Sequence, residues 1–156
     1  MDFELEDLKR IYNEYEKKYG IPRYKELNED FEIDKIDRES DSFLRVVRKV
    51  MMEKVVNSLN FLDMLLNPGN APRIYYGFLK SIKEEDTKMI DEIYTKLGNL
   101  SMESLALEID YSEKKEAEMI VKVFREWDSV KVNFRKLMEH IQHPTREEKK
   151  ERNYYG

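Results

Sequence analysis

Hydrophobic positions recur at seven-residue intervals over residues 112–141, the most regular pattern in the chain. Two series offset by three residues make up this seam: Ile120, Trp127, Phe134 and Ile141, with Val123, Val130 and Leu137. No glycine or proline interrupts the stretch, so the pattern predicts about 45 Å of continuous helix at a rise of about 1.5 Å per residue. An apolar seam of this length needs partner helices to cover it.

A second long helix is predicted over residues 39–66, and it is apolar in two directions. Its polar side is a narrow stripe made of Arg45, Lys49, Glu53, Asn57 and Asn60. Because almost every other direction is apolar, this helix must pack against neighbours on two sides. We therefore expect it to be the central and least exposed helix.

The N-terminal third predicts one helix and one irregular segment. Acidic residues load the first turn of residues 3–19 and basic residues the last, and Gly20 follows where a left-handed residue would end a helix. After Pro22 we expect at most a short turn. Residues 28–42 form an acidic connector, predicted to be mostly irregular, whose apolar side chains pack onto the core. These side chains are Phe31, Ile33 and Ile36.

Turn residues divide the region between the two long helices. Residues 67–72 are predicted to end the second helix, with Gly69 at a positive φ. A short helix follows, with Ile74, Tyr75 and Phe78 on its apolar face. The spacing of Ser81 and Glu84 then favours a new helix that stops at Gly98–Asn99. A further short helix capped by Ser101 would carry Met102, Leu105 and Ile109.

These elements predict an all-α fold: a single-domain helical bundle of five to six helices over residues 1–144, followed by a short charged tail over residues 145–156. No strand pattern occurs in the sequence. A chain of 156 residues buries roughly 68–70% of its unfolded surface, enough for a core without metal or disulfides. The absence of cysteine excludes disulfides, thiolate metal sites and cysteine nucleophiles.

Charge and targeting signals favour a cytoplasmic protein without a membrane span. The acidic N-terminus has no apolar run behind a basic flank, which argues against a secretory or transit signal. The densest apolar stretch, residues 46–66, carries five charged side chains, and each costs about 2.5–3.5 kcal/mol at a bilayer centre. The net charge of −5 argues mildly against broad binding to nucleic acid or anionic membrane.

Candidate chemistry is sparse. Glu139, His140 and His143 lie near the end of the long last helix, where they could ligate a metal ion or simply interact with the helix dipole. The second interpretation is favoured, because the chain has no Glu-x-x-His pair of the kind that di-iron bundles use. We expect no catalytic, metal or cofactor-binding residues. An enzyme is therefore less favoured than a non-enzymatic protein, and a metal-dependent helical enzyme ranks third among the functions considered.

Two basic clusters support an alternative function in association with nucleic acid. The first, on the last helix, contains Lys122, Arg125, Lys131, Arg135 and Lys136; the second, in the tail, contains Lys149, Lys150 and Arg152. A basic face followed by the tail tyrosines could hold phosphates and stack bases. Acidic residues interrupt both clusters, so a solvated, ion-paired surface is the preferred interpretation and nucleic acid an unfavoured partner.

A protein interface is the sharpest functional hypothesis. Tyr75 and Tyr76 are adjacent, so both cannot face one core, and Arg73 lies beside them. Tyrosine and arginine are enriched at interface hot spots. The predicted interface residues are Asn70, Arg73, Tyr76, Tyr154 and Tyr155. The alternative, a tight connection between helices that leaves one amphipathic tyrosine at the surface, is the preferred interpretation of this segment.

The favoured function is a non-enzymatic helical protein-interaction module that binds itself or a subunit of a larger complex. The N-terminal helix has a seam ending in Tyr12, Tyr15 and Tyr19 that could cover Trp127 and Phe134. This packing could occur within one chain or between two. Exchange between chains would give a symmetric homodimer, which we favour.

Overall fold

The computed structural model describes residues 3–142, and the chain is helical throughout this range apart from its connections. The α-helices are α1 (Leu5–Tyr19), α2 (Tyr24–Phe31), α3 (Phe43–Leu66), α4 (Tyr76–Leu79), α5 (Glu84–Ile109) and α6 (Glu113–Gln142). Short 3₁₀ turns cover Ile33–Lys35, Pro68–Asn70 and Arg73–Tyr75. No strand occurs among residues 3–142. The prediction of an all-α helical bundle is confirmed.

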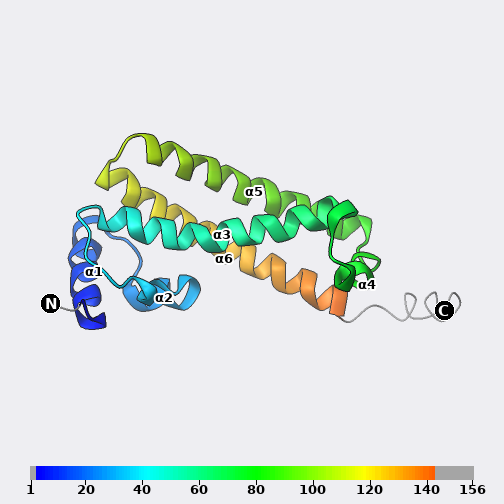
Figure 1. Ribbon diagram of the computed structural model, residues 1–156, viewed down its shortest axis with the longest axis horizontal. Helices are drawn as coiled ribbons and strands as arrows, with labels where there is room; N and C mark the ends of the chain where they lie inside the picture. Colours follow the sequence, from blue (N-terminus) through cyan, green and yellow to red (C-terminus); the bar gives the residue numbers. More distant parts are fainter. Residues whose placement is uncertain (1–2, 143–156) are drawn as a thin grey trace, which may run out of the picture.

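Three long helices, α3, α5 and α6, run side by side along the length of the molecule (Figure 1). Helices α1 and α2 lie at one end and α4 at the other. Helix α3 packs against both α5 and α6, and the three helices share one apolar core. No helix within residues 3–142 combines the length and the apolar character that crossing a bilayer requires.

The predicted last helix is present as α6. Its seam positions Ile120, Val123 and Val130 are buried, and Trp127 is only 5% exposed. At its start the Lys115 N–H donates to the Ser112 hydroxyl oxygen over 3.3 Å, as expected for an N-cap serine. The predicted stop at His143–Pro144 lies outside the described residues.

The N-terminal region differs from the prediction after Gly20. Gly20 ends α1 in the left-handed conformation, at a φ of 66°, as predicted. The next residues form the eight-residue helix α2 rather than a short turn. Leu27 and Phe31, four residues apart, are both buried on its inner face; this burial stabilises a helix that the acidic composition did not suggest. The predicted packing of Phe31, Ile33 and Ile36 onto the core is confirmed.

The predicted division of residues 84–109 into two helices is wrong, because α5 continues through Gly98–Asn99 and Ser101. Leu97 and Leu100 are both buried, so the core-facing stripe crosses the predicted stop. A glycine inside a helix costs about 1 kcal/mol relative to alanine, which the burial of two leucines offsets. The N-cap of α5 also differs from the prediction. Lys83 occupies this position in place of Ser81, and its backbone N–H donates to the Asp86 carboxylate over 2.9 Å.

Two arrangements that the sequence allows do not occur within this chain. Gly69 lies in a 3₁₀ turn and does not have a positive φ, because that turn keeps its residues in the right-handed region. Helix α1 does not cover Trp127 and Phe134 within this chain: Phe31 of α2 lies 5.6 Å from Trp127 between ring centroids, and Phe61 of α3 lies 6.5 Å from Phe134. Helix α2 occupies the position expected for α1. The homodimer stays a prediction.

Candidate functional site

The predicted interface residues Asn70, Arg73 and Tyr76 lie on the connection between α3 and α5, and all three are exposed. This connection is held to the bundle at Ala71, which is buried, and at Phe78, whose ring lies 6.2 Å from that of Phe61. The structure thus brings three of the five predicted residues together. Tyr154 and Tyr155 lie outside the described residues.

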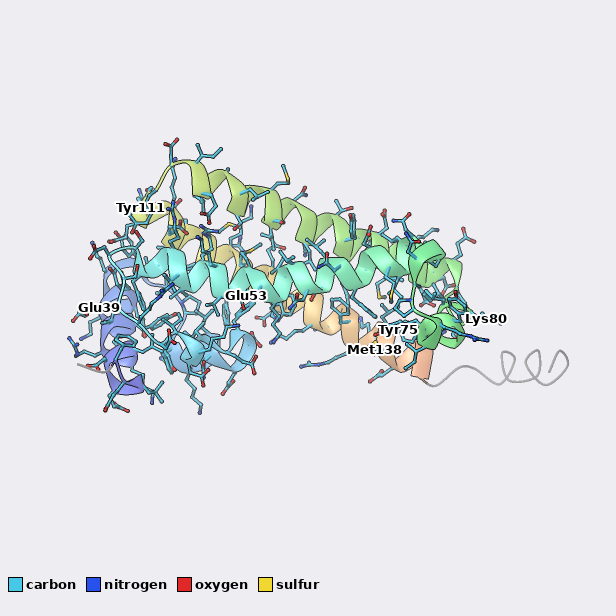
Figure 2. The ribbon with its side chains drawn as sticks, in the orientation of Figure 1. Glu39, Glu53, Tyr75, Lys80, Tyr111 and Met138 are labelled. Atoms are coloured by element: carbon cyan, nitrogen blue, oxygen red, sulfur yellow. The ribbon has the colours of Figure 1, made fainter. Side chains whose placement is uncertain are left out.

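Between these anchors the chain exposes three consecutive large apolar side chains. Ile74 is 86% exposed, Tyr76 50% and Tyr75 37%. The prediction that Ile74 and Tyr75 share an inward face with Phe78 is therefore wrong. A 3₁₀ turn over Arg73–Tyr75 precedes α4, and its period of three residues takes Ile74 out of line with Phe78. Figure 2 shows Tyr75 at the α4 end of the bundle.

The three long helices enclose three grooves, and the one between α3 and α6 is covered by this chain itself. Phe31 of α2 packs on Trp127, and Lys131 of α6 bonds Asp30 of α2 over 2.7 Å. Closer to the N-terminus of α6, Lys18 and Tyr19 of α1 both donate to Glu113, over 2.7 and 2.6 Å. These contacts leave little of this groove open to a partner.

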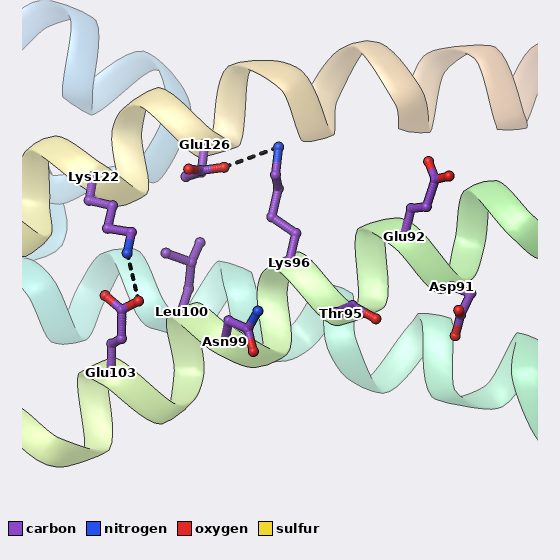
Figure 3. A pocket seen from close by; sticks show the side chains of 9 residues that line it. All are labelled: Asp91, Glu92, Thr95, Lys96, Asn99, Leu100, Glu103, Lys122 and Glu126. Carbon is purple, nitrogen blue, oxygen red and sulfur yellow. Dashed lines mark hydrogen bonds and ion pairs between the residues drawn. The ribbon is translucent and has the colours of Figure 1, made fainter.

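The groove between α5 and α6 is crossed by ion pairs. Lys96 of α5 lies 3.0 Å from Glu126 of α6, and Lys122 of α6 lies 2.6 Å from Glu103 of α5. Figure 3 shows both pairs reaching across from opposite helices, with Leu100 between them. The hollow of about 470 Å³ along this flank is therefore polar and spanned by the chain's own charges.

The groove between α3 and α5 is open and apolar in comparison. Met52, Val56 and Leu105 line a shallow hollow of about 540 Å³, and neither α1 nor α2 covers Leu105, which is 58% exposed. Met102 and Ile109 extend the apolar surface along α5, with exposed fractions of 67% and 82%. We call Met52, Val56, Met102, Leu105 and Ile109 the apolar flank. The sequence placed Met102, Leu105 and Ile109 on one helix face without showing that this face points to solvent.

Beneath the apolar flank, a buried arginine joins the three long helices. Arg48 of α3 is 2% exposed, and its guanidinium donates to both carboxylate oxygens of Glu116 on α6, which is fully buried. The same guanidinium donates to the Ser104 hydroxyl over 2.5 Å and to Glu108 over 2.7 Å, both on α5. Arg45 also donates to Glu116, over 3.3 Å. This ion cluster fixes α3, α5 and α6 relative to one another.

The ion cluster lowers the pKa of the Glu108 carboxyl, which lies at its edge. Hydrogen bonding from the Arg48 guanidinium holds the pKa of the Glu108 carboxyl below its ordinary value. Glu108 also lies 3.4 Å from Lys49. Since every polar group in this cluster has a partner, its arrangement matches a structural role and offers no open position to a substrate.

Three of the candidate metal and nucleic-acid residues, His140, Lys122 and Lys131, lie next to acidic groups. The His140 Nδ1 lies 2.9 Å from the Asp86 carboxylate, whereas His143 lies outside the described range. No group of three potential metal-ligating side chains occurs within residues 3–142. Lys122 and Lys131, two of the five basic residues considered on the last helix, form ion pairs with Glu103 and Asp30.

Comparison with known proteins gives no family for this chain: no family model, no curated protein and no solved structure matches it.

Proposed function

We propose that the protein works by binding another protein, through exposed apolar and aromatic side chains, rather than by catalysis. The observation that carries this proposal is the exposure of Ile74, Tyr75 and Tyr76 on a segment anchored at both ends. Contiguous apolar surface rimmed by polar residues is typical of protein-interaction sites. Arg73 is exposed beside it, and arginine and tyrosine are frequent binding hot spots.

The geometry of the connection supports this proposal. Ala71 and Phe78 fix the backbone on either side of the patch, so the three apolar side chains are presented on an ordered turn instead of a free loop. Pre-ordering lowers the entropy that binding costs.

An affinity-purification experiment tests the proposal. The full chain and an Arg73→Ala/Tyr76→Ala variant are each cross-linked in lysate of the source organism and analysed by mass spectrometry. Arg125→Ala/Val132→Ala, which truncates an exposed arginine and an exposed apolar residue on α6, serves as the matched control. Circular dichroism checks that all three chains keep their fold. We expect the Arg73→Ala/Tyr76→Ala variant alone to lose the partner, and unchanged recovery would contradict the proposal.

Nucleic-acid association is the second candidate, and one hollow favours it. Three basic residues, Lys114, Lys122 and Arg125, line a hollow of about 390 Å³ on α6 beside Tyr19. Glu118 lines the same hollow, and Lys122 is already paired with Glu103, so the positive charge is partly neutralised. Binding of a labelled oligonucleotide that weakens with added salt and with Lys114→Ala/Arg125→Ala would support this candidate over protein binding.

A further inference from the structure

We infer that the connection between α3 and α5 binds an extended, acidic segment of another protein, with carboxylates at positions i and i+4 and an apolar side chain at i+2. This inference rests on the proposed function, because it concerns the same surface, and it adds the chemistry of the partner. The two can still fail separately, since the same surface could bind an uncharged segment.

The connection is a basic surface on an acidic protein. Residues 64–83 are the longest stretch of the chain without an acidic residue, and they contain three basic ones, Arg73, Lys80 and Lys83. The chain as a whole has 33 acidic residues and a net charge of −5. Exposed basic side chains in such a stretch attract a partner of opposite charge.

The positive charge of Arg73 and Lys80 is not neutralised by the chain that the structure describes. Both side chains are exposed, and neither forms an ion pair with any residue in the range 3–142. The nearest acidic residues along the chain belong to the neighbouring helices: Asp63 lies in the last turn of α3, and Glu84 and Glu85 lie in the first turn of α5, where the helix dipole favours them. Two cations of the connection are therefore available to a partner.

Arg73, Tyr76 and Lys80 form a row along the connection. The Tyr76 N–H donates to the Arg73 carbonyl, which closes one 3₁₀ turn, and the Lys80 N–H donates to the Tyr76 carbonyl over 3.1 Å, which closes one α-helical turn. Residues one turn apart lie on the same side of a helix, so the half-exposed Tyr76 lies between the two cations. At about 2.0 Å per residue in the 3₁₀ turn and about 1.5 Å in the α-helix, the row is about 12 Å long.

An extended segment matches the length of this row. Its alternate side chains lie on one face, and at about 3.3 Å per residue its positions i and i+4 are about 13 Å apart. Carboxylates at these two positions would reach Arg73 and Lys80, and the side chain at i+2 would lie over the Tyr76 ring. Ile74, next to Arg73, is 86% exposed and offers apolar surface that a free anion would leave in water. The partner is therefore a peptide segment that carries apolar as well as acidic side chains.

A titration of the labelled full chain with short, end-capped peptides tests the inference. The probe is Glu-Ser-Leu-Ser-Glu. One control peptide has glutamine in place of both glutamates, and a second, Glu-Ser-Leu-Glu-Ser, has the probe's composition with the last carboxylate on the other face. Nuclear magnetic resonance maps the binding site and measures the affinity. Arg73→Gln/Lys80→Gln removes the two cations, and Lys115→Gln/Arg125→Gln removes two exposed cations of α6 as the matched control.

We expect the glutamate probe to shift resonances of residues 73–80. Arg73→Gln/Lys80→Gln should weaken its binding about fivefold at low ionic strength, and Lys115→Gln/Arg125→Gln should change it by less than about twofold. Added salt should weaken the binding to the unchanged chain. Both control peptides should bind more weakly than the probe. Arg73→Glu/Lys80→Glu should instead prefer a peptide with lysine in place of both glutamates.

Equal binding of the glutamate and glutamine peptides, with both lost in Tyr76→Ala, would overturn the acidic partner and leave the proposed function standing. A glutamate probe that does not shift residues 73–80 would also overturn the inference, whereas the proposed function depends on recovery of the partner from lysate.

Two further results would assign the surface to another occupant and overturn the inference. Tighter binding of the probe by Glu147→Gln/Glu148→Gln/Glu151→Gln would show that acidic residues at the C-terminal end of the same chain compete for it. Sedimentation that shows a dimer lost only in Arg73→Gln/Lys80→Gln would assign it to a second copy.

Discussion

The two flanks of α5 differ although they belong to the same helix and both border a long neighbour. Toward α6, Lys96 and Glu103 reach across the groove to Glu126 and Lys122. Toward α3, Leu105 stays exposed beside the hollow, and Met102, three residues earlier on α5, is also exposed. The paired side chains of the first flank are partly exposed, and exposed ion pairs contribute little to stability. The second leaves apolar area in water, which burial against a partner would remove at about 25 cal/mol per Å².

Polar side chains are buried beneath the open groove between α3 and α5. Arg48 lies at the floor of the hollow and links α3 to Ser104 of α5 and Glu116 of α6. A buried, fully partnered ion cluster fixes register more than it adds stability. In this protein the cluster joins α3 to α5 at the floor of the open groove.

The largest expected effect is that of breaking this cluster. Arg48→Met should lower the free energy of unfolding by about 3–5 kcal/mol, because Glu116 would remain buried with Arg45 as its one cationic neighbour. Urea denaturation followed by circular dichroism measures the change. Arg48→Met/Glu116→Leu removes both charges and should recover most of the loss. A single variant as stable as the wild type would show that the helices are not held by this cluster.

The covered groove gives a second strong test. Trp127→Ala should cost about 3–5 kcal/mol, since Trp127 is 5% exposed and packs on Phe31. Thermal unfolding followed by circular dichroism gives the result without relying on tryptophan emission. A loss below about 1 kcal/mol would mean that α2 does not cover the α3–α6 groove, which would leave two open flanks instead of one.

A substitution at Gly98 should have a smaller effect on stability, and this effect should be a gain. Gly98→Ala should stabilise the isolated chain by about 0.5–1 kcal/mol, because alanine lowers the backbone entropy lost on folding and its Cβ meets no neighbour. Denaturant unfolding checks this gain. Destabilisation would reveal an intramolecular contact at Gly98 and would argue against open space beside the apolar flank.

The smallest effect on stability is expected for the ion pairs between α5 and α6. A double-mutant cycle of Lys122→Ala and Glu103→Ala should give a coupling of about 0.2–1 kcal/mol, since both side chains are partly exposed. The coupling should shrink as salt is added. A coupling above about 2 kcal/mol would show that this flank is a sealed interface and would weaken its contrast with the open one.

Elements with long, uninterrupted periodicity could be predicted from the sequence, and elements decided by tertiary packing could not. The α6 seam extends over eight turns and determines its helix by itself. Local stop signals at Gly98–Asn99 suggested two helices in place of α5, because a sequence shows the cost of glycine but not the burial of Leu97 and Leu100 that offsets it. Helix α2 was missed for a related reason, since acidic residues surround its two buried positions.

The candidate site was predicted in part. Adjacent tyrosines beside Arg73 correctly indicated exposed side chains at that connection, because neighbours in a helix cannot face one core. Periodicity grouped Met102, Leu105 and Ile109 without stating which way they face. The role of Arg48 was missed, although a signal existed: it lies four residues after Leu44 and seven before Val55, both buried, so it falls within an apolar face of α3.

The reactivity of single cysteines, introduced one at a time into the cysteine-free chain, tests most directly whether the groove between α3 and α5 is open. We predict that Leu105→Cys, at a position that is 58% exposed, is alkylated rapidly in the folded protein, and that Leu100→Cys, at a position that is 2% exposed, is protected until the protein unfolds. Slow alkylation of Leu105→Cys would contradict an open flank between α3 and α5.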